Sequence, residues 1–164
     1  MIEKSCATGF LNSKRMPLKA HESILVFYKR LPTYHPQMVP GAHKVNKLGS
    51  TSGNYGTYEH TGERQASAYY PRDVLRYSNG FSSTPTHGGA KRHPTQKPLS
   101  ISEYMIRTYT NPGDTVLDNC MGSGTTAVAA INTGRHFIGY ELEQEYIDIA
   151  HERIAEAKAN ACHV

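Results

Sequence analysis

Apolar and polar residues follow three different patterns along this chain. After residue 97, apolar residues recur with helical spacing in some stretches and gather into short β-branched runs in others. This pattern predicts a helix, a strand, a helix, a strand and a helix, over residues 99–110, 115–117, 125–132, 136–140 and 143–159. Strands that alternate with helices are typical of α/β proteins with parallel strands. This part of the chain is therefore expected to form an α/β unit.

The first 30 residues carry a strand pattern instead. Residues 23–28 read Ser-Ile-Leu-Val-Phe-Tyr, which predicts a buried strand, and residues 4–10 are a weaker strand candidate. The polar stretch 12–20, which contains Pro17, would connect them. A β-hairpin is expected here.

Between residues 31 and 95 neither periodicity persists. Pro, Gly, Ser, Thr, Asn, His and Tyr dominate the composition, which predicts loops with short strands at most. Tyrosines alternate there with Lys and Arg, a combination suited to the bases and phosphates of nucleic acid. A flexible insertion whose tyrosines fold back onto the core is the alternative.

Charge is divided unequally along the chain. Residues 1–97 contain 14 Lys and Arg against 5 Asp and Glu, a net charge of +9, whereas residues 98–164 contain 4 against 9, a net charge of −5. A basic first part favours a surface that faces a polyanion, although a simple sorting of solvated charges would look the same. The candidate contacts to nucleic acid are Lys44, Lys47, Tyr55, Arg64, Arg72 and Arg76.

Composition limits the class of protein. The chain has 164 residues, enough for one structural domain, and no apolar run approaches the roughly 20 residues that span a membrane. Its beginning does not resemble a signal peptide. Three widely separated cysteines and nine histidines show neither disulfide nor metal-ligand spacing. We expect a cytoplasmic protein without a metal and without a membrane partner.

A glycine-rich turn follows the first strand of the α/β unit. Gly122 and Gly124 allow a tight turn, and the next helix offers free N–H groups to an anion. Glu141 follows the next strand, where a carboxylate can accept hydrogen bonds from both hydroxyls of a ribose. The residues also fit the dinucleotide pattern G-x-G-x-x-A, so a nicotinamide-binding fragment and an ordinary glycine-capped turn are alternatives.

Several motifs together resemble the β class of DNA amino-methyltransferases, in particular its small phage and prophage members. The sequence Lys-Arg-His-Pro-Thr-Gln-Lys-Pro at residues 91–98, followed by a strand and by Gly-Ser-Gly-Thr-Thr at 122–126, resembles motifs X and I. Gly-Tyr-Glu at 139–141, followed by Tyr146, resembles motif II. Residues 3–10 and 21–28 are similar to the later segments of the catalytic region.

This resemblance implies a fold and a division of the chain. The fold would be the Rossmann-like α/β fold of S-adenosylmethionine-dependent methyltransferases, with an incomplete, mostly parallel sheet, a β-hairpin and a loop-rich insertion. Residues 1–30 would be the hairpin of a catalytic-region remnant. Residues 31–90 would be a target recognition region, and residues 91–164 the S-adenosylmethionine-binding unit.

The resemblance also implies the site residues. The cofactor loop would comprise Asp118, Gly122, Ser123, Gly124, Thr125 and Thr126, and Glu141 would hold the ribose. The residues that would close over the methionine portion are His93, Pro94, Thr95, Gln96 and Lys97, although His93 and Gln96 could instead cap the next helix. The family usually has Asp-Pro-Phe or Asp-Pro-Tyr where this chain has Asp118-Asn-Cys, and Cys120 is expected to pack beside the loop.

The sequence contains no Pro-Pro pair, whereas the family transfers the methyl group with an Asp/Asn/Ser-Pro-Pro-aromatic motif. We therefore identify no catalytic residue and expect a truncated product of a restriction-modification methyltransferase from a bacterium or a phage-infected host. It would act on adenine N6, or on cytosine N4, with little or no activity alone. Exposed strand edges would favour a homodimer or a complementary N-terminal fragment. A noncatalytic DNA-binding or cofactor-binding remnant is the alternative.

Overall fold

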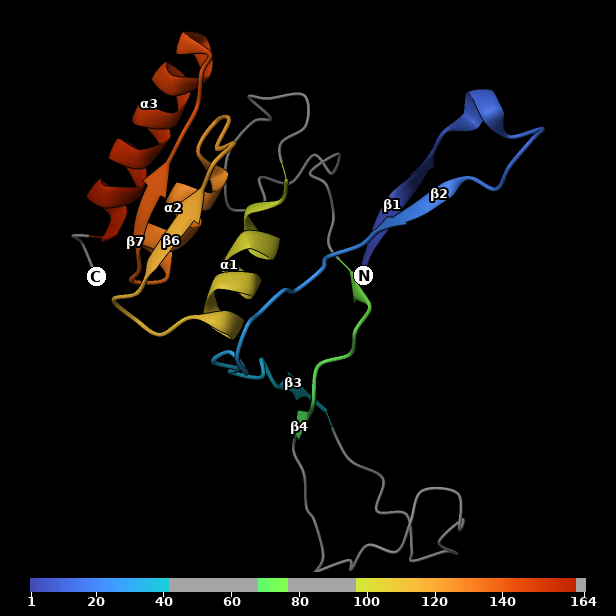
Figure 1. Ribbon diagram of the computed structural model, residues 1–164, viewed down its shortest axis with the longest axis horizontal. Helices are drawn as coiled ribbons and strands as arrows, with labels where there is room; N and C mark the ends of the chain where they lie inside the picture. Colours follow the sequence, from blue (N-terminus) through green and yellow to red (C-terminus); the bar gives the residue numbers. More distant parts are fainter. Residues whose placement is uncertain (42–67, 77–96, 162–164) are drawn as a thin grey trace, which may run out of the picture. The chain divides into compact units, whose positions relative to one another are not determined.

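The computed structural model of the protein describes residues 1–41, 68–76 and 97–161 (Figure 1). The chain forms two compact units, one of Met1–His35 with Arg72–Val164 and one of Pro36–Pro71. In the second unit, β3 (Val39–Pro40) and β4 (Ala68–Tyr69) pair in antiparallel fashion. The predicted DNA contacts Lys44, Lys47, Tyr55 and Arg64 lie outside the described residues.

The α/β unit follows the order that the sequence predicts. It contains α1 (Leu99–Tyr109), β6 (Thr115–Asp118), α2 (Thr125–Asn132), β7 (His136–Gly139) and α3 (Gln144–Ala161). Strands β6 and β7 are parallel, in a register that pairs Thr115 with His136 and Asp118 with Gly139. The predictions of an α/β class and of parallel strands are confirmed.

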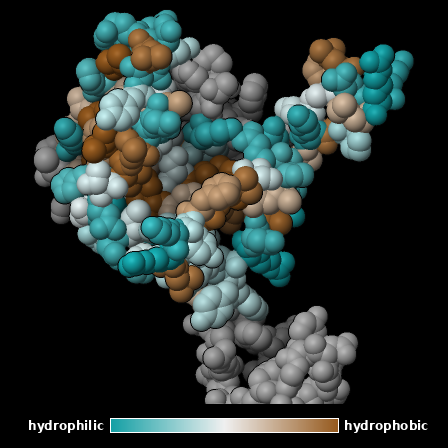
Figure 2. Space-filling model, in the orientation of Figure 1, coloured by the Kyte–Doolittle hydropathy of each residue, from teal (hydrophilic) through white to brown (hydrophobic). Residues whose placement is uncertain are grey.

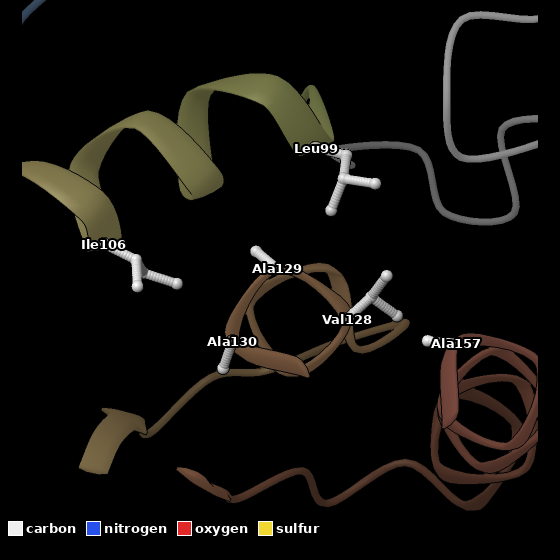
Figure 3. Packing of buried hydrophobic residues seen from close by; sticks show 6 residues of the cluster. All are labelled: Leu99, Ile106, Val128, Ala129, Ala130 and Ala157. Carbon is white, nitrogen blue, oxygen red and sulfur yellow. The ribbon is translucent and has the colours of Figure 1, made fainter. Parts of the chain in front are cut away.

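The core of this unit lies where the three helices meet beside the sheet. Leu99 and Ile106 of α1 point toward α2, where Val128, Ala129 and Ala130 are buried, and Ala157 of α3 closes the cluster from the other side (Figure 3). Small alanine side chains on α2 let both neighbouring helices approach closely. The partly buried Val116 and Phe137 of the two strands pack against this cluster. The helices therefore hold the β6–β7 pair from one face.

A second, three-stranded sheet comes from the beginning of the chain. It has the order β2-β1-β5, where β1 (Ile2–Thr8) pairs in antiparallel fashion with β2 (Lys19–Glu22) and in parallel with β5 (Leu75–Arg76). A short 3-10 helix, η1 (Phe10–Asn12), lies in the connection between β1 and β2. A hairpin therefore forms near the expected place.

The second strand of this hairpin differs from the prediction. Residues 23–28 form no strand in the structure, and Phe27 is 87% exposed, so the prediction of a buried strand there is wrong. The polar segment of β2 pairs with β1 in its place. On its other edge β1 pairs with β5 at Ile2 and Glu3. A strand pattern in one segment does not determine which segment pairs, because strand formation depends on the packing and pairing partners that the whole chain supplies.

Candidate cofactor site

The turn between β6 and α2 takes its shape from two glycines. Gly122 has a φ of 52° and Gly124 a φ of 78°, a left-handed conformation that side chains with a Cβ disfavour. A Cβ on Gly124 would also lie only 2.9 Å from the Cβ of Ala150 in α3. The Gly124 N–H donates to the Met121 carbonyl, and the Gly124 carbonyl accepts from Val128 in α2. The turn thus joins the first turn of the helix directly.

Asp118 connects the two ends of this turn. Its Oδ1 atom accepts a hydrogen bond from the Cys120 N–H at 3.0 Å, and its Oδ2 atom accepts one from Thr126 Oγ1 at 2.6 Å. Cys120 begins the turn and Thr126 lies in the first turn of α2. Bonds to a carboxylate are stronger than bonds between neutral groups, so Asp118 holds the turn firmly against the helix.

Glu141 connects the turn to the next strand. Its Oε2 atom accepts a hydrogen bond from the Gly122 N–H at 2.8 Å, and its Oε1 atom accepts from the N–H groups of Leu142 and Glu143 at 2.8 and 3.1 Å. The Met121 N–H also donates to the Tyr140 carbonyl at 3.0 Å. A half-buried carboxylate therefore lies at the carboxyl edge of β7, directly beside the glycine turn, as the sequence predicted.

Comparison with known proteins assigns the chain to a family. The family model described as DNA methylase (N6_N4_Mtase) matches residues 1–152. The chain belongs to this family of DNA amino-methyltransferases. The curated relatives include the type II methyltransferases M.HinfI of Haemophilus influenzae and M2.DpnII of Streptococcus pneumoniae. They are 39% identical over 108 residues and 38% identical over 109 residues. These matches cover 65% and 60% of this chain but 29% and 41% of the relatives, so the chain spans less than half of their length.

A solved structure extends the match to most of the chain. The crystal structure of the M1.HpyAVI-SAM complex is 26% identical, covers 93% of this chain and 59% of its own, and superposes with a TM-score of 0.50. The expected fold of S-adenosylmethionine-dependent DNA methyltransferases is thereby confirmed.

Of the residues predicted to close over the methionine portion of the cofactor, the structure describes only Lys97. His93, Pro94, Thr95 and Gln96 lie outside the described residues. The Lys97 ammonium donates to Glu22 Oε2 of β2 at 2.5 Å, and Lys4 lies 3.3 Å from the other oxygen of that carboxylate. The hydrogen bond from Lys97, followed by the contact with Lys4, lowers the pKa of Glu22, although burial opposes this shift. Lys97 therefore ties β2 to the residues before α1.

Two predicted DNA contacts, Arg72 and Arg76, are exposed. The Arg76 guanidinium forms an ion pair of 2.6 Å with Glu3 across the β1–β5 pair. An exposed ion pair contributes little free energy in water, so the Arg76 guanidinium could exchange Glu3 for another anion at little cost.

Other predictions for the site have different outcomes. Cys120 was expected to pack beside the loop, and this is wrong, because Cys120 is an exposed free cysteine. Its N–H, not its side chain, holds it to the turn.

Within residues 1–41, 68–76 and 97–161, no three His, Cys, Asp or Glu side chains gather in a way that could hold a metal ion. In the described part of the chain, no helix combines the length and apolar character needed to cross a membrane.

Sequence reasoning missed one residue of the site. Arg153 of α3 is buried beneath the glycine turn, and its Nη1 atom donates to the carbonyl and hydroxyl of Ser123 and to the hydroxyl of Thr125. The sequence pattern of the last helix contained a sign of this residue. Arg153 is three residues after Ala150 and four before Ala157, so a cation stood on the otherwise apolar face of the predicted helix.

Proposed function

We propose that this chain binds S-adenosylmethionine at the turn formed by Gly122, Ser123 and Gly124, with Glu141 holding the ribose hydroxyls. The observation that carries the proposal is the hydrogen bond of 2.8 Å from the Gly122 N–H to Glu141, which holds a carboxylate next to the turn at the edge of the sheet. The solved relative that covers most of the chain is a complex with SAM, which supports this cofactor over a nicotinamide dinucleotide.

Different groups of the chain would bind different parts of the cofactor. Three backbone N–H groups already donate to the carboxylate of Glu141, two of them to Oε1, so the ribose hydroxyls would bind by replacing some of these backbone donors. The N–H groups at the beginning of α2 and the positive end of its dipole suit the methionine carboxylate. Residues 93–97 would close over the methionine portion. When bound, the cofactor supplies an electrophilic methyl group.

The activity of the whole protein would be methylation of an exocyclic amine in double-stranded DNA, at adenine N6 or at cytosine N4. The methyl acceptor would need an aromatic platform for the flipped base and hydrogen-bond acceptors for its amino group. A Pro-Pro-aromatic motif would supply these groups, and the 164 residues contain no Pro-Pro pair. We therefore propose that this chain alone binds the cofactor and transfers little or no methyl.

One face of the β6–β7 pair, here called the free face, is left exposed by the described residues and suggests how activity would be completed. Leu117, Ile138 and Tyr140 are 63%, 48% and 62% exposed. Figure 2 shows hydrophobic surface over these two strands. Parallel sheets are normally covered on both faces. The solved relative is longer than the matched region, which covers 59% of it. We propose that a complementary segment bearing the Pro-Pro-aromatic motif covers this face.

Calorimetry tests the cofactor proposal. We expect the 164-residue chain to bind S-adenosylmethionine and S-adenosylhomocysteine but not NAD. Replacing Glu141 with Ala should weaken binding by about tenfold or more, because bonds to a charged acceptor are lost. Glu143→Ala is the matched control, since Glu143 is a neighbouring exposed acid. A folded chain that binds neither methionine compound, or that binds NAD equally well, contradicts the proposal.

A methylation assay tests the activity of the isolated chain. Plasmid DNA incubated with the chain and radiolabelled cofactor should incorporate little or no label. Addition of a segment that carries the Pro-Pro-aromatic motif of a relative should raise incorporation, and a Gly124→Asp variant should abolish that gain. Robust transfer by the chain alone would show that no complementary segment is needed.

A further inference from the structure

A buried cation lies directly beneath the candidate cofactor turn. Arg153 is 5% exposed. Its Nη1 atom is 3.0 Å from Ser123 Oγ and 3.2 Å from Thr125 Oγ1, and it also donates to the Ser123 carbonyl. Removing a charge from water is costly unless hydrogen bonds compensate. An arginine at this position therefore calls for a reason beyond filling space, because an apolar side chain could fill the same volume without that cost.

The contacts of α3 with the turn involve three consecutive residues. Ser123 and Thr125 meet Arg153, and between them Gly124 packs against Ala150, which lies three residues earlier on the same face of the helix. Ser123 and Thr125 are buried, and their hydroxyls face the arginine. Helix α3 thus forms the floor of the turn, and Arg153 supplies the polar part of that floor.

We propose that Arg153 is a positioning residue of the cofactor site, which holds Ser123 and Thr125 so that the glycine turn keeps the shape that receives S-adenosylmethionine. The proposal rests on the proposed function of the turn. Glycines leave a chain many conformations, and ordering them upon binding lowers affinity. The hydrogen-bond donors of Arg153 beneath the turn would hold it in one conformation before the cofactor binds. In this proposal the backbone of Ser123 and Thr125 forms part of the cofactor site, and their side chains hold that backbone in place by bonding to Arg153.

Two variants separate positioning from packing. Arg153→Met keeps the volume of the stem but removes charge and donors. Arg153→Lys keeps a charge, and its ammonium has three hydrogens for the three oxygens that Nη1 contacts. The matched control is Arg135, which is half-buried in the same unit and donates to Thr110 and to the Thr133 carbonyl, away from the turn. Arg135→Met and Arg135→Lys carry the same chemical changes to a place without a cofactor role.

Calorimetric titration with S-adenosylhomocysteine and thermal unfolding are measured on wild type and on each variant. We expect Arg153→Met to remain folded and to lose affinity by about tenfold or more, and Arg153→Lys to recover most of that loss. Arg135→Met should lower the unfolding temperature but keep affinity within about threefold of wild type, because its bonds support another part of the unit. A Thr125→Val change should weaken binding less in the Arg153→Met background than in wild type, since the shared bond is already absent.

The outcomes distinguish the two proposals. If wild type does not bind S-adenosylhomocysteine, the proposed function fails and this inference fails with it. If wild type binds, and the Met variants at 153 and 135 lose affinity equally or not at all, Arg153 is structural only and the inference is overturned. If Arg153→Met does not fold, Thr125→Val in the wild-type background decides, because it removes one of the oxygens that Arg153 holds. Reduced affinity of Thr125→Val at an unchanged unfolding temperature supports positioning, and unchanged affinity overturns it.

Discussion

At the scale of single residues, the candidate site depends on a glycine that serves two purposes. Gly124 takes a left-handed conformation, and its Cα faces Ala150 at a distance that leaves no room for a side chain. Gly134, by contrast, has a φ of 72°, and a Cβ added to it would meet nothing within 4 Å. The two residues share the conformational demand, but only Gly124 adds a close approach between the turn and α3.

Comparison of Gly124→Ala with Gly134→Ala separates these demands. Both changes should destabilise the fold by about 1–2 kcal/mol, because each forces alanine into a left-handed conformation. Gly124→Ala should cost more, since its Cβ would lie 3.2 Å from the backbone of Ala150, and it should weaken S-adenosylhomocysteine binding by at least about tenfold. Urea unfolding and calorimetry check both results. Equal losses of affinity in the two variants would contradict a special role for Gly124.

At the scale of elements, a small charge cluster links the hairpin to α1. Glu22 of β2 accepts from Lys97 and lies beside Lys4 of β1, so three segments far apart in sequence meet at one carboxylate. The bond with Lys97 is the main reason that the pKa of Glu22 is lowered. A lowered pKa in the folded state means that the charged form stabilises the fold. That contribution is present above the ordinary pKa of 4.5 and is lost as the pH falls through the lowered folded value.

This linkage predicts a pH-dependent difference between wild type and Glu22→Gln. The free energy of unfolding should differ most above pH 4.5, and the difference should shrink as acid protonates Glu22 below that value. Denaturant unfolding at several pH values measures it, and high salt should reduce the difference because the cluster is partly exposed. Lys97→Met should reproduce most of the effect. A difference that stays constant down to acid pH would show that the cluster does not stabilise the fold.

At the scale of the whole molecule, the described residues leave one face of the β6–β7 pair without cover. Leu117 and Ile138 stand side by side on that face, whereas the neighbouring Val116 and Phe137 point into the core. Alternation along each strand sets this division. Exposed apolar patches of this kind promote association with another surface.

The free face predicts concentration-dependent association. Sedimentation of the isolated chain should reveal self-association that the double change Leu117→Thr and Ile138→Thr reduces, because threonine keeps strand propensity but removes apolar surface. Val116→Thr is the control, and it should lower stability without relieving association, since Val116 packs on the core cluster. A monomeric wild type at every concentration would remove the basis for a partner on this face.

The basic first part of the chain predicts salt-dependent DNA binding. Arg76→Met should weaken binding to duplex DNA and reduce the slope of log affinity against log salt by about one, as expected for one lost phosphate contact. Arg107→Met is the control, because Arg107 pairs with Glu103 within α1 in the acidic second part. Fluorescence anisotropy over a range of salt concentrations measures both slopes. An unchanged slope for Arg76→Met would exclude it as a phosphate contact.

The sequence by itself determined the secondary structure after residue 97 and the position of the glycine turn. The helices and strands after residue 97, the parallel pair, the glycine turn and the acid at its edge could all be predicted, because periodicity, glycine conformation and the ends of strands depend on neighbouring residues. The family motifs and the match over residues 1–152 agree with that order.

Tertiary structure decided the contacts between distant segments. Residues 23–28 carry a strand pattern, yet they form no strand, and the polar segment of β2 pairs with β1 instead. Lys97 was predicted to contact the cofactor, and in the structure its ammonium donates to Glu22, 75 residues away. Arg153 lies under the turn, 30 residues from Ser123. The pattern of residues within one segment specifies which face of that segment is buried. Which strand edge, charged group or hydroxyl it contacts depends on the three-dimensional packing of all segments.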